Sequence, residues 1–193
     1  MAELSIGANM AWQIAAHEAA SARFQFIEAE HIFIGLCSLE KVVGLSPEDS
    51  GLSPKDLKAL KEEYSILQDL GLDMTQLRRR MRKRFGAGNY RHTEKVIHRS
   101  ESCKKMFSRA YEITSSEDVA CLHLLAAMLE KPGNINQVLS ELNIDAESLS
   151  EQIKDHIGKA DETRPESKTP FLDKYGRDLT KLARDGKLGP FIG

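Results

Sequence analysis

The chain carries one helical pattern twice. Residues 66–86 align without a gap with residues 138–158, and apolar side chains fall on the same positions in both copies: Leu70 with Leu142, Leu72 with Ile144, Leu77 with Leu149, Met81 with Ile153 and Phe85 with Ile157. The polar positions between them differ freely. A pattern that keeps only its apolar positions is typical of two segments that bury the same face. A repeat of this length indicates a duplicated structural unit.

The duplication extends upstream of these segments. Residues 5–19 align with residues 100–114, and residues 31–36 align with residues 123–128. The spacing between equivalent residues changes from block to block, so differences in length fall in the connections. Loops tolerate such changes while the helices are kept. We therefore predict an all-α fold in which two pseudo-twofold-related four-helix repeats form one compact bundle.

The repeats also predict the domain boundaries. Residues 1–158 form the duplicated domain, with copy one at about 5–86 and copy two at about 100–158. Residues 159–170 are polar and charged without apolar periodicity, which predicts a flexible linker. Residues 171–193 recover a helical pattern, but this segment is too short to fold alone.

Caps and apolar spacing predict where the helices lie. The expected N-cap residues are Ser5, Ser53, Asp73 and Ser100. Residues 42–53 contain two glycines and a proline, which predict a loop without helix. Helices are expected at about 8–22, 30–39, 54–71, 74–86, 101–113, 117–130, 134–142 and 145–157.

Composition argues against several classes of protein. The formal net charge is −2, so no global field favours nucleic acid or a membrane surface. No apolar run approaches the roughly 20 residues of a membrane span. The N-terminus has no basic segment before an apolar one, so no signal peptide is expected. Three scattered cysteines do not form a disulfide framework, which predicts a reducing, cytoplasmic setting.

The most charged run is basic and extends from Arg78 to Arg84. Such a run can form a face for phosphates or an acidic partner. The favoured interpretation is a solvated helix surface, which Met81 supports because it lies at a core position. The equivalent run in copy two, residues 150–156, is not basic, so the fold does not require this charge. No aromatic residues interleave to stack bases, and no nucleic acid is expected.

The sequence gives little evidence for a metal site or a catalytic site. Cys121 and His123, with Cys37 and His31 in the matching copy, have poor spacing for zinc, so no metal site is predicted. The chain contains no GxxxxGK[ST] phosphate loop. Taken alone, the polypeptide does not look catalytic.

Ser5 and Glu30 form a candidate binding pair. A cap serine with free amides at a helix start can hold an anionic group, and a carboxylate near another helix start can pair with a cation. The alternative is that each residue simply caps its own helix.

Two segments resemble the Clp unfoldases ClpA, ClpB and ClpC. The run FIEAEHIFIGL at 26–36 is similar to a segment of their duplicated N-terminal domain, and the tail at 169–193 is similar to the lead-in to their first AAA+ module. The tail match is the more specific one. Because both helical copies resemble the duplicated domain, the resemblance covers most of the chain. The insertion at 42–53 and the basic run lie outside the resemblance. Gly189 and Phe191 depart from the usual family pattern.

The resemblance implies a piece of a ring-forming, ATP-driven protein unfoldase. Its N-terminal domain would recruit unfolded or tagged substrate proteins, or an adaptor, and residues 171–193 would begin the first AAA+ module. In a longer chain the adenine of ATP would lie beside Pro190, Phe191, Ile192 and Gly193. This chain stops before the phosphate loop, so no cofactor and no catalysis are expected of it. ATP and Mg would belong to the full-length parent, which could also engage a ClpP-type peptidase.

The resemblance also implies a ligand. Relatives of the ClpC type recognise phosphoarginine through a threonine cap and a glutamate in each copy. Ser5 and Glu30 match these positions in the first copy; in the second, Ser100 matches the cap but Leu122 replaces the glutamate. One phosphoarginine-like pocket is therefore expected at best. A hydrophobic groove between the copies, which would bind apolar segments, is at least as well supported.

The sequence thus predicts a substrate- or adaptor-recruiting domain that acts by protein binding. The alternative is a stand-alone accessory or regulatory subunit of a Clp protease complex. A third possibility is an anion-binding helical protein that uses Arg78–Arg84, whose binding would weaken steeply with salt.

Overall fold

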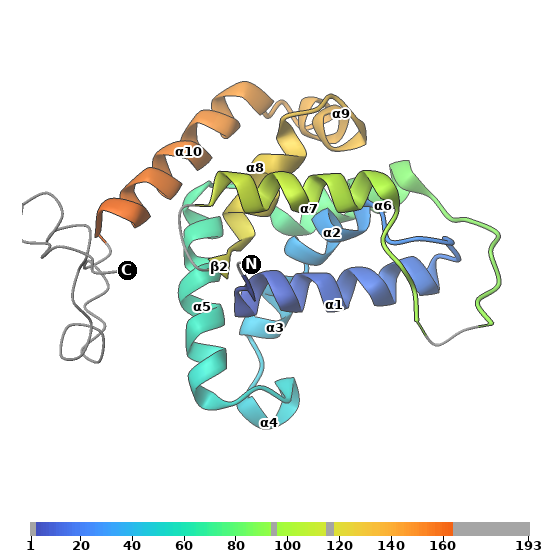
Figure 1. Ribbon diagram of the computed structural model, residues 1–193, viewed down its shortest axis with the longest axis horizontal. Helices are drawn as coiled ribbons and strands as arrows, with labels where there is room; N and C mark the ends of the chain where they lie inside the picture. The colour runs from blue at the N-terminus through green and yellow to red at the C-terminus, as the bar shows by residue number, and fades with distance from the viewer. Residues whose placement is uncertain (1–2, 94–95, 115–117, 164–193) are drawn as a thin grey trace, which may run out of the picture. The chain divides into compact units, whose positions relative to one another are not determined.

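The computed structural model describes residues 3–93, 96–114 and 118–163, and these are mostly helical (Figure 1). The all-α prediction is confirmed. The first repeat comprises β1 (Glu3–Leu4), α1 (Ile6–Ser21), α2 (Ala29–Leu36), α3 (Leu39–Val43), α4 (Pro47–Ser50), α5 (Pro54–Asp69) and α6 (Met74–Phe85). The second comprises α7 (Glu101–Ile113), β2 (Asp118–Val119), α8 (Cys121–Leu129), α9 (Asn134–Glu141) and α10 (Ala146–Thr163).

The four expected N-caps are confirmed. Each side chain accepts a hydrogen bond from a backbone amide three residues on, which satisfies one of the free donors at a helix start. The donors are Ala8 N to Ser5 (3.1 Å), Asp56 N to Ser53 (3.1 Å), Gln76 N to Asp73 (2.8 Å) and Cys103 N to Ser100 (3.1 Å).

Several helix boundaries differ from the predicted ones. The insertion at 42–53 is not a helix-free loop, because α3 ends inside it and α4 forms within it. Ser46 caps α4, Pro47 occupies its first turn, and Gly51 ends it with a φ of 68° that favours glycine. The second helix of copy two begins at Cys121, since the residues before it form β2. α10 extends beyond Gly158, where the predicted linker starts; residues 164–193, with the rest of that linker and the predicted AAA+ start, lie outside the described residues.

The core centres on α2 and α8, in which almost every residue is buried. α1 packs closely on α2 through buried alanines. At Gly35 of α2, an added Cβ would clash with the backbone carbonyl of Ala11, so only glycine permits this approach. The sequence pattern of small residues on α1 therefore sets the distance between the first two helices.

The two copies are joined crosswise by short backbone pairings. β1, before the first helix of copy one, pairs in parallel with β2, before the second helix of copy two. An isolated parallel bridge between Ile27 and Arg99 makes the reverse pairing. Ser5 N donates to Val119 O, and its repeat equivalent Ser100 N donates to Ile27 O, both at 3.0 Å. The backbone just before the first helix of each repeat is therefore hydrogen-bonded to the other repeat.

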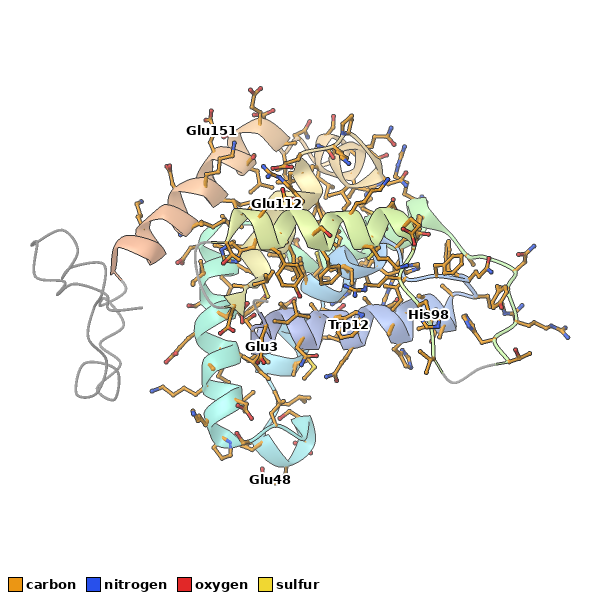
Figure 2. The ribbon with its side chains drawn as sticks, viewed as in Figure 1. Glu3, Trp12, Glu48, His98, Glu112 and Glu151 are labelled. Atoms are coloured by element: carbon orange, nitrogen blue, oxygen red, sulfur yellow. The ribbon has the colours of Figure 1, made fainter. Side chains whose placement is uncertain are left out.

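Arg99 contacts aromatic rings from both copies. The guanidinium of Arg99 lies 4.6 Å from the ring centroid of Phe107 and 5.6 Å from that of Trp12. Trp12 and Phe107 are repeat-equivalent residues, and Figure 2 shows Trp12 on α1. The pseudo-twofold relation predicted from the sequence is therefore visible in side-chain contacts as well.

No helix in the described ranges is long and apolar enough to cross a membrane.

Candidate functional site

A groove runs along α7 and α8 and reaches the starts of α2 and α9. It consists of two adjoining cavities, of about 580 and 170 Å³, that share Ser102, Met106, Ala127 and Lys131. The larger lies between α7 and the end of α8. The smaller continues to Ala29 and Glu30 of copy one, so the groove is built by both repeats.

The floor of the groove is apolar and its rim is charged. Met106, Ala127 and Met128 are buried beneath it with small exposed fractions. On the rim, Arg109 donates to Glu130 at 2.7 and 2.8 Å and to Glu112 at 2.9 Å. The hydrogen bond from Arg109 holds the pKa of Glu130 below its usual value. The rim is thus held by ion pairs, while the floor offers apolar surface.

Glu30 lies at the inner end of the groove and is half-buried. Its Oε1 accepts a hydrogen bond from Asn134 Nδ2 at 2.8 Å. Asn136 Oδ1 is buried and has no hydrogen-bond partner in the part of the chain that the structure describes. The smaller cavity therefore has mainly apolar walls with one carboxylate, that of Glu30, at its inner end, and it can take an apolar side chain.

Ser5 lies at a different place, beside α8. Its Oγ donates to Glu63 Oε1 at 2.7 Å, and the other oxygen of Glu63 accepts from Gly7 N at 2.9 Å. Glu63 Oε1 also accepts from Cys121 N, at 2.7 Å. The carboxylate of Glu63, from α5, therefore occupies the anion-binding donors at the starts of both α1 and α8.

Ser100 has an equivalent arrangement with a different carboxylate. Its Oγ donates to Glu28 Oε2, which also accepts from Ser102 Oγ at 3.1 Å. Glu28 is the N-cap residue of α2, the helix that carries Glu30. Leu122, by contrast, is buried in α8, next to the helix start that Ser5 approaches.

The structure thus groups the four candidate residues across the copies. Ser5 lies beside the helix of Leu122, and Ser100 lies beside the helix of Glu30. The family resemblance pairs Ser5 with Glu30 because both match its positions in copy one. Glu63 and Glu28 were missed, and only Glu28 had a signal, its position just before a predicted helix.

The fold uses three of the six basic residues in the run on α6. Arg78 is buried and donates to the carbonyl of Cys37 at 3.3 Å, at the end of α2. Arg82 pairs with Glu18, and Arg84 pairs with Glu141 at 2.8 Å. Met81 is fully buried, as its core position predicts.

The histidines and cysteines considered for metal have structural roles. His31 Nδ1 accepts from Glu28 N and His123 Nδ1 accepts from Ala120 N, both at 2.9 Å, so each caps its own helix. Burial raises the pKa of Cys37 to about 12, which keeps it a thiol. Within the described ranges no three His, Cys, Asp or Glu side chains are grouped to hold a metal ion. Pro190–Gly193 lie outside these ranges.

Comparison with known proteins finds similarity to ClpB chaperones. The chain is 27% identical over 179 residues to Chaperone protein ClpB 1 of Thermosynechococcus vestitus and 30% identical over 195 residues to Chaperone protein ClpB2, chloroplastic, of Oryza sativa subsp. japonica. These alignments cover 91% and 96% of this chain. The chain spans 18% of the length of each relative. No protein-family model matches the chain.

Proposed function

Since this chain is a homologue of ClpB chaperones over about nine-tenths of its length, we propose that it is the protein-recruiting N-terminal domain of an ATP-dependent Clp unfoldase. It acts by binding unfolded or tagged substrate proteins, or an adaptor that carries them, and is not itself catalytic. ATP hydrolysis with Mg, any ClpP-type peptidase partner and a cytoplasmic location belong to the same proposal for the parent protein.

The observation that supports this function best is the groove built by both copies. Its floor of Met106, Ala127 and Met128 offers apolar surface, and apolar segments are what an unfolded protein exposes. Binding of this kind buries apolar area, so it should show a negative heat-capacity change and survive salt.

The alternative function is that of a stand-alone accessory or regulatory subunit of a Clp protease complex. That protein would act without an ATPase of its own. Immunoblotting of the native polypeptide separates the two, because the first requires a chain several times longer than this one and the second does not.

The proposal is tested by blocking the groove. Ser102 lines both cavities and is exposed, so Ser102→Tyr fills the groove; it also removes the hydrogen bond to Glu28, and circular dichroism checks that the variant is folded. Ser65→Tyr, at an exposed position on α5, is the matched control. The probe is fluorescently labelled, reduced and carboxymethylated lactalbumin, followed by anisotropy with the whole chain.

We expect Ser102→Tyr to weaken binding at least about tenfold, which corresponds to about 1.4 kcal/mol, with Ser65→Tyr unchanged. Equal binding by all three proteins would exclude the groove as the recruiting site. An absence of binding by the wild type would exclude direct capture of unfolded protein.

A further inference from the structure

The outer face of α6 carries three cations that the fold does not use. The helix buries Met74, Leu77 and Met81 on its inner side. On its flanks, Arg82 forms an ion pair with Glu18 of α1, and Arg84 forms an ion pair with Glu141 of α9. Arg79, Arg80 and Lys83 remain; all are exposed, and none forms an ion pair or hydrogen bond within residues 3–93, 96–114 and 118–163.

These cations share one helix face. Arg79 and Lys83 are four residues apart, and Arg80 and Lys83 are three apart, so their side chains are neighbours. Like charges at these spacings destabilise a helix. The dipole at the helix end favours a cation in the last turn, which accounts for Lys83 but not for the two arginines. Local helix stability therefore does not explain why these three cations lie together on one face of α6.

The equivalent face of copy two carries the opposite charge. Glu151, Gln152 and Asp155 of α10 align with Arg79, Arg80 and Lys83, and all three are exposed. Glu151 points away from α10 in Figure 2. Leu149 and Ile153 are buried, so the acidic face of α10 points to solvent. Leu77 and Met81 are buried in the same way beneath the basic face of α6. Neither Glu151 nor Asp155 has an ion-pair partner among the residues that the structure describes.

We propose that the basic face of α6 (Arg79, Arg80 and Lys83) binds the acidic face of α10 (Glu151, Gln152 and Asp155) of a second copy of this chain. The two carboxylates are spaced four residues apart, as are Arg79 and Lys83, so two ion pairs can form at once between helices that lie side by side. Arg80 can donate to the amide oxygen of Gln152. Because each copy presents both faces, the contact is head-to-tail and each copy can engage two others.

Such a contact is weak and salt-dependent. Exposed ion pairs contribute little individually, and the Debye length falls from about 30 Å at 0.01 M salt to about 3 Å at 1 M. We therefore expect self-association of the whole chain at low ionic strength that disappears at high ionic strength. Sedimentation velocity at rising protein concentration measures it directly.

Charge reversal gives the decisive test. The basic-face variant is Arg79→Glu with Arg80→Glu and Lys83→Glu, and the acidic-face variant is Glu151→Lys with Asp155→Lys. Each variant alone should remain monomeric, since its two faces have the same sign. An equimolar mixture should associate again, because each variant presents the face that the other lacks. The control for net charge replaces the exposed Lys55, Lys58 and Lys61 of α5 with glutamate and should associate like the wild type.

Three results would overturn the proposal or limit it to another partner. A wild type that stays monomeric at every salt concentration overturns the proposal and leaves the basic face to an acidic partner protein. Association by either variant alone, or a mixture no heavier than its components, overturns it as well. Circular dichroism confirms that each variant is folded. The test is independent of the groove, because no residue of either face lines it.

Discussion

Glu63 contacts the N-cap serine of α1 in the same way as Glu28 contacts the N-cap serine of α7. Each carboxylate accepts from the cap serine of a first helix, Ser5 or Ser100, although the two come from different elements. In copy two the residue equivalent to Glu28 is Ala120, which has no carboxylate, and α5 supplies Glu63 to Ser5 instead. The two repeats thus meet one electrostatic requirement in two ways.

Replacement of Glu63 should destabilise the protein. Glu63→Ala removes the acceptor for Ser5 Oγ, Gly7 N and Cys121 N, and leaving such donors unmatched costs about 1–3 kcal/mol. Urea denaturation of the whole chain measures the loss. Glu62→Ala is the control, because the side chain of Glu62 is exposed and forms a surface ion pair with Lys58, which contributes little to stability. Equal stability of both variants would show that the Glu63 contacts contribute nothing.

Phosphoarginine should bind poorly to the wild type. The donors that would hold its phosphate at Ser5 and Ser100 already bind Glu63 and Glu28, so a ligand must displace an internal carboxylate. Calorimetric titration with phosphoarginine, with arginine as control, is expected to give no saturable heat. Saturable binding near one equivalent that is lost in Glu30→Ala would contradict this expectation and establish the pocket.

Stability should fall with acid through His31. Burial lowers its pKa from 6.5 to about 4, so the folded protein holds the neutral ring while the unfolded chain takes up a proton. The stabilisation is fully present above pH 6.5 and is lost as the pH falls from 6.5 to about 4. The loss is on the order of 3 kcal/mol by linkage.

The measurement for His31 is urea denaturation at pH 7.5 and pH 4.5 for wild type and His31→Gln. Carboxylates also titrate near the lower pH, so the difference between the two proteins is the relevant quantity. We expect the variant to be less stable at pH 7.5 and to lose less on acidification. An identical pH dependence in both proteins would remove His31 as the cause.

Gly35 should tolerate no side chain. In Gly35→Ala the new methyl group would meet the backbone of Ala11, and overpacking of a core typically costs about 1–3 kcal/mol. Gly44→Ala is the matched control, because a Cβ there has no neighbour closer than 3.8 Å. Thermal unfolding of both variants compares them, and a Gly35→Ala protein as stable as the control would mean that α1 and α2 can separate at little cost.

The sequence predicted the helices well because the apolar positions of each repeat are those the structure buries. Met81 and Ile153 lie at equivalent positions, and both are fully buried. The crosswise grouping of Ser5 with α8 was not predictable, since alignment of two copies shows which residues are equivalent and not which copy each one contacts. Glu63 was missed for a related reason: it lies upstream of the aligned segment at 66–86, where neither caps nor periodicity distinguish it.

The crosswise pairing of β1 with β2, and of Ile27 with Arg99, makes this one polypeptide resemble an exchanged homodimer whose subunits have been fused. A single repeat on its own would leave Ser5 N, or its equivalent Ser100 N, without the carbonyl that the other repeat supplies. Because the two halves are tethered in one chain, each finds its partner without a bimolecular encounter, and each carries its own surface charge, basic on α6 and acidic on α10.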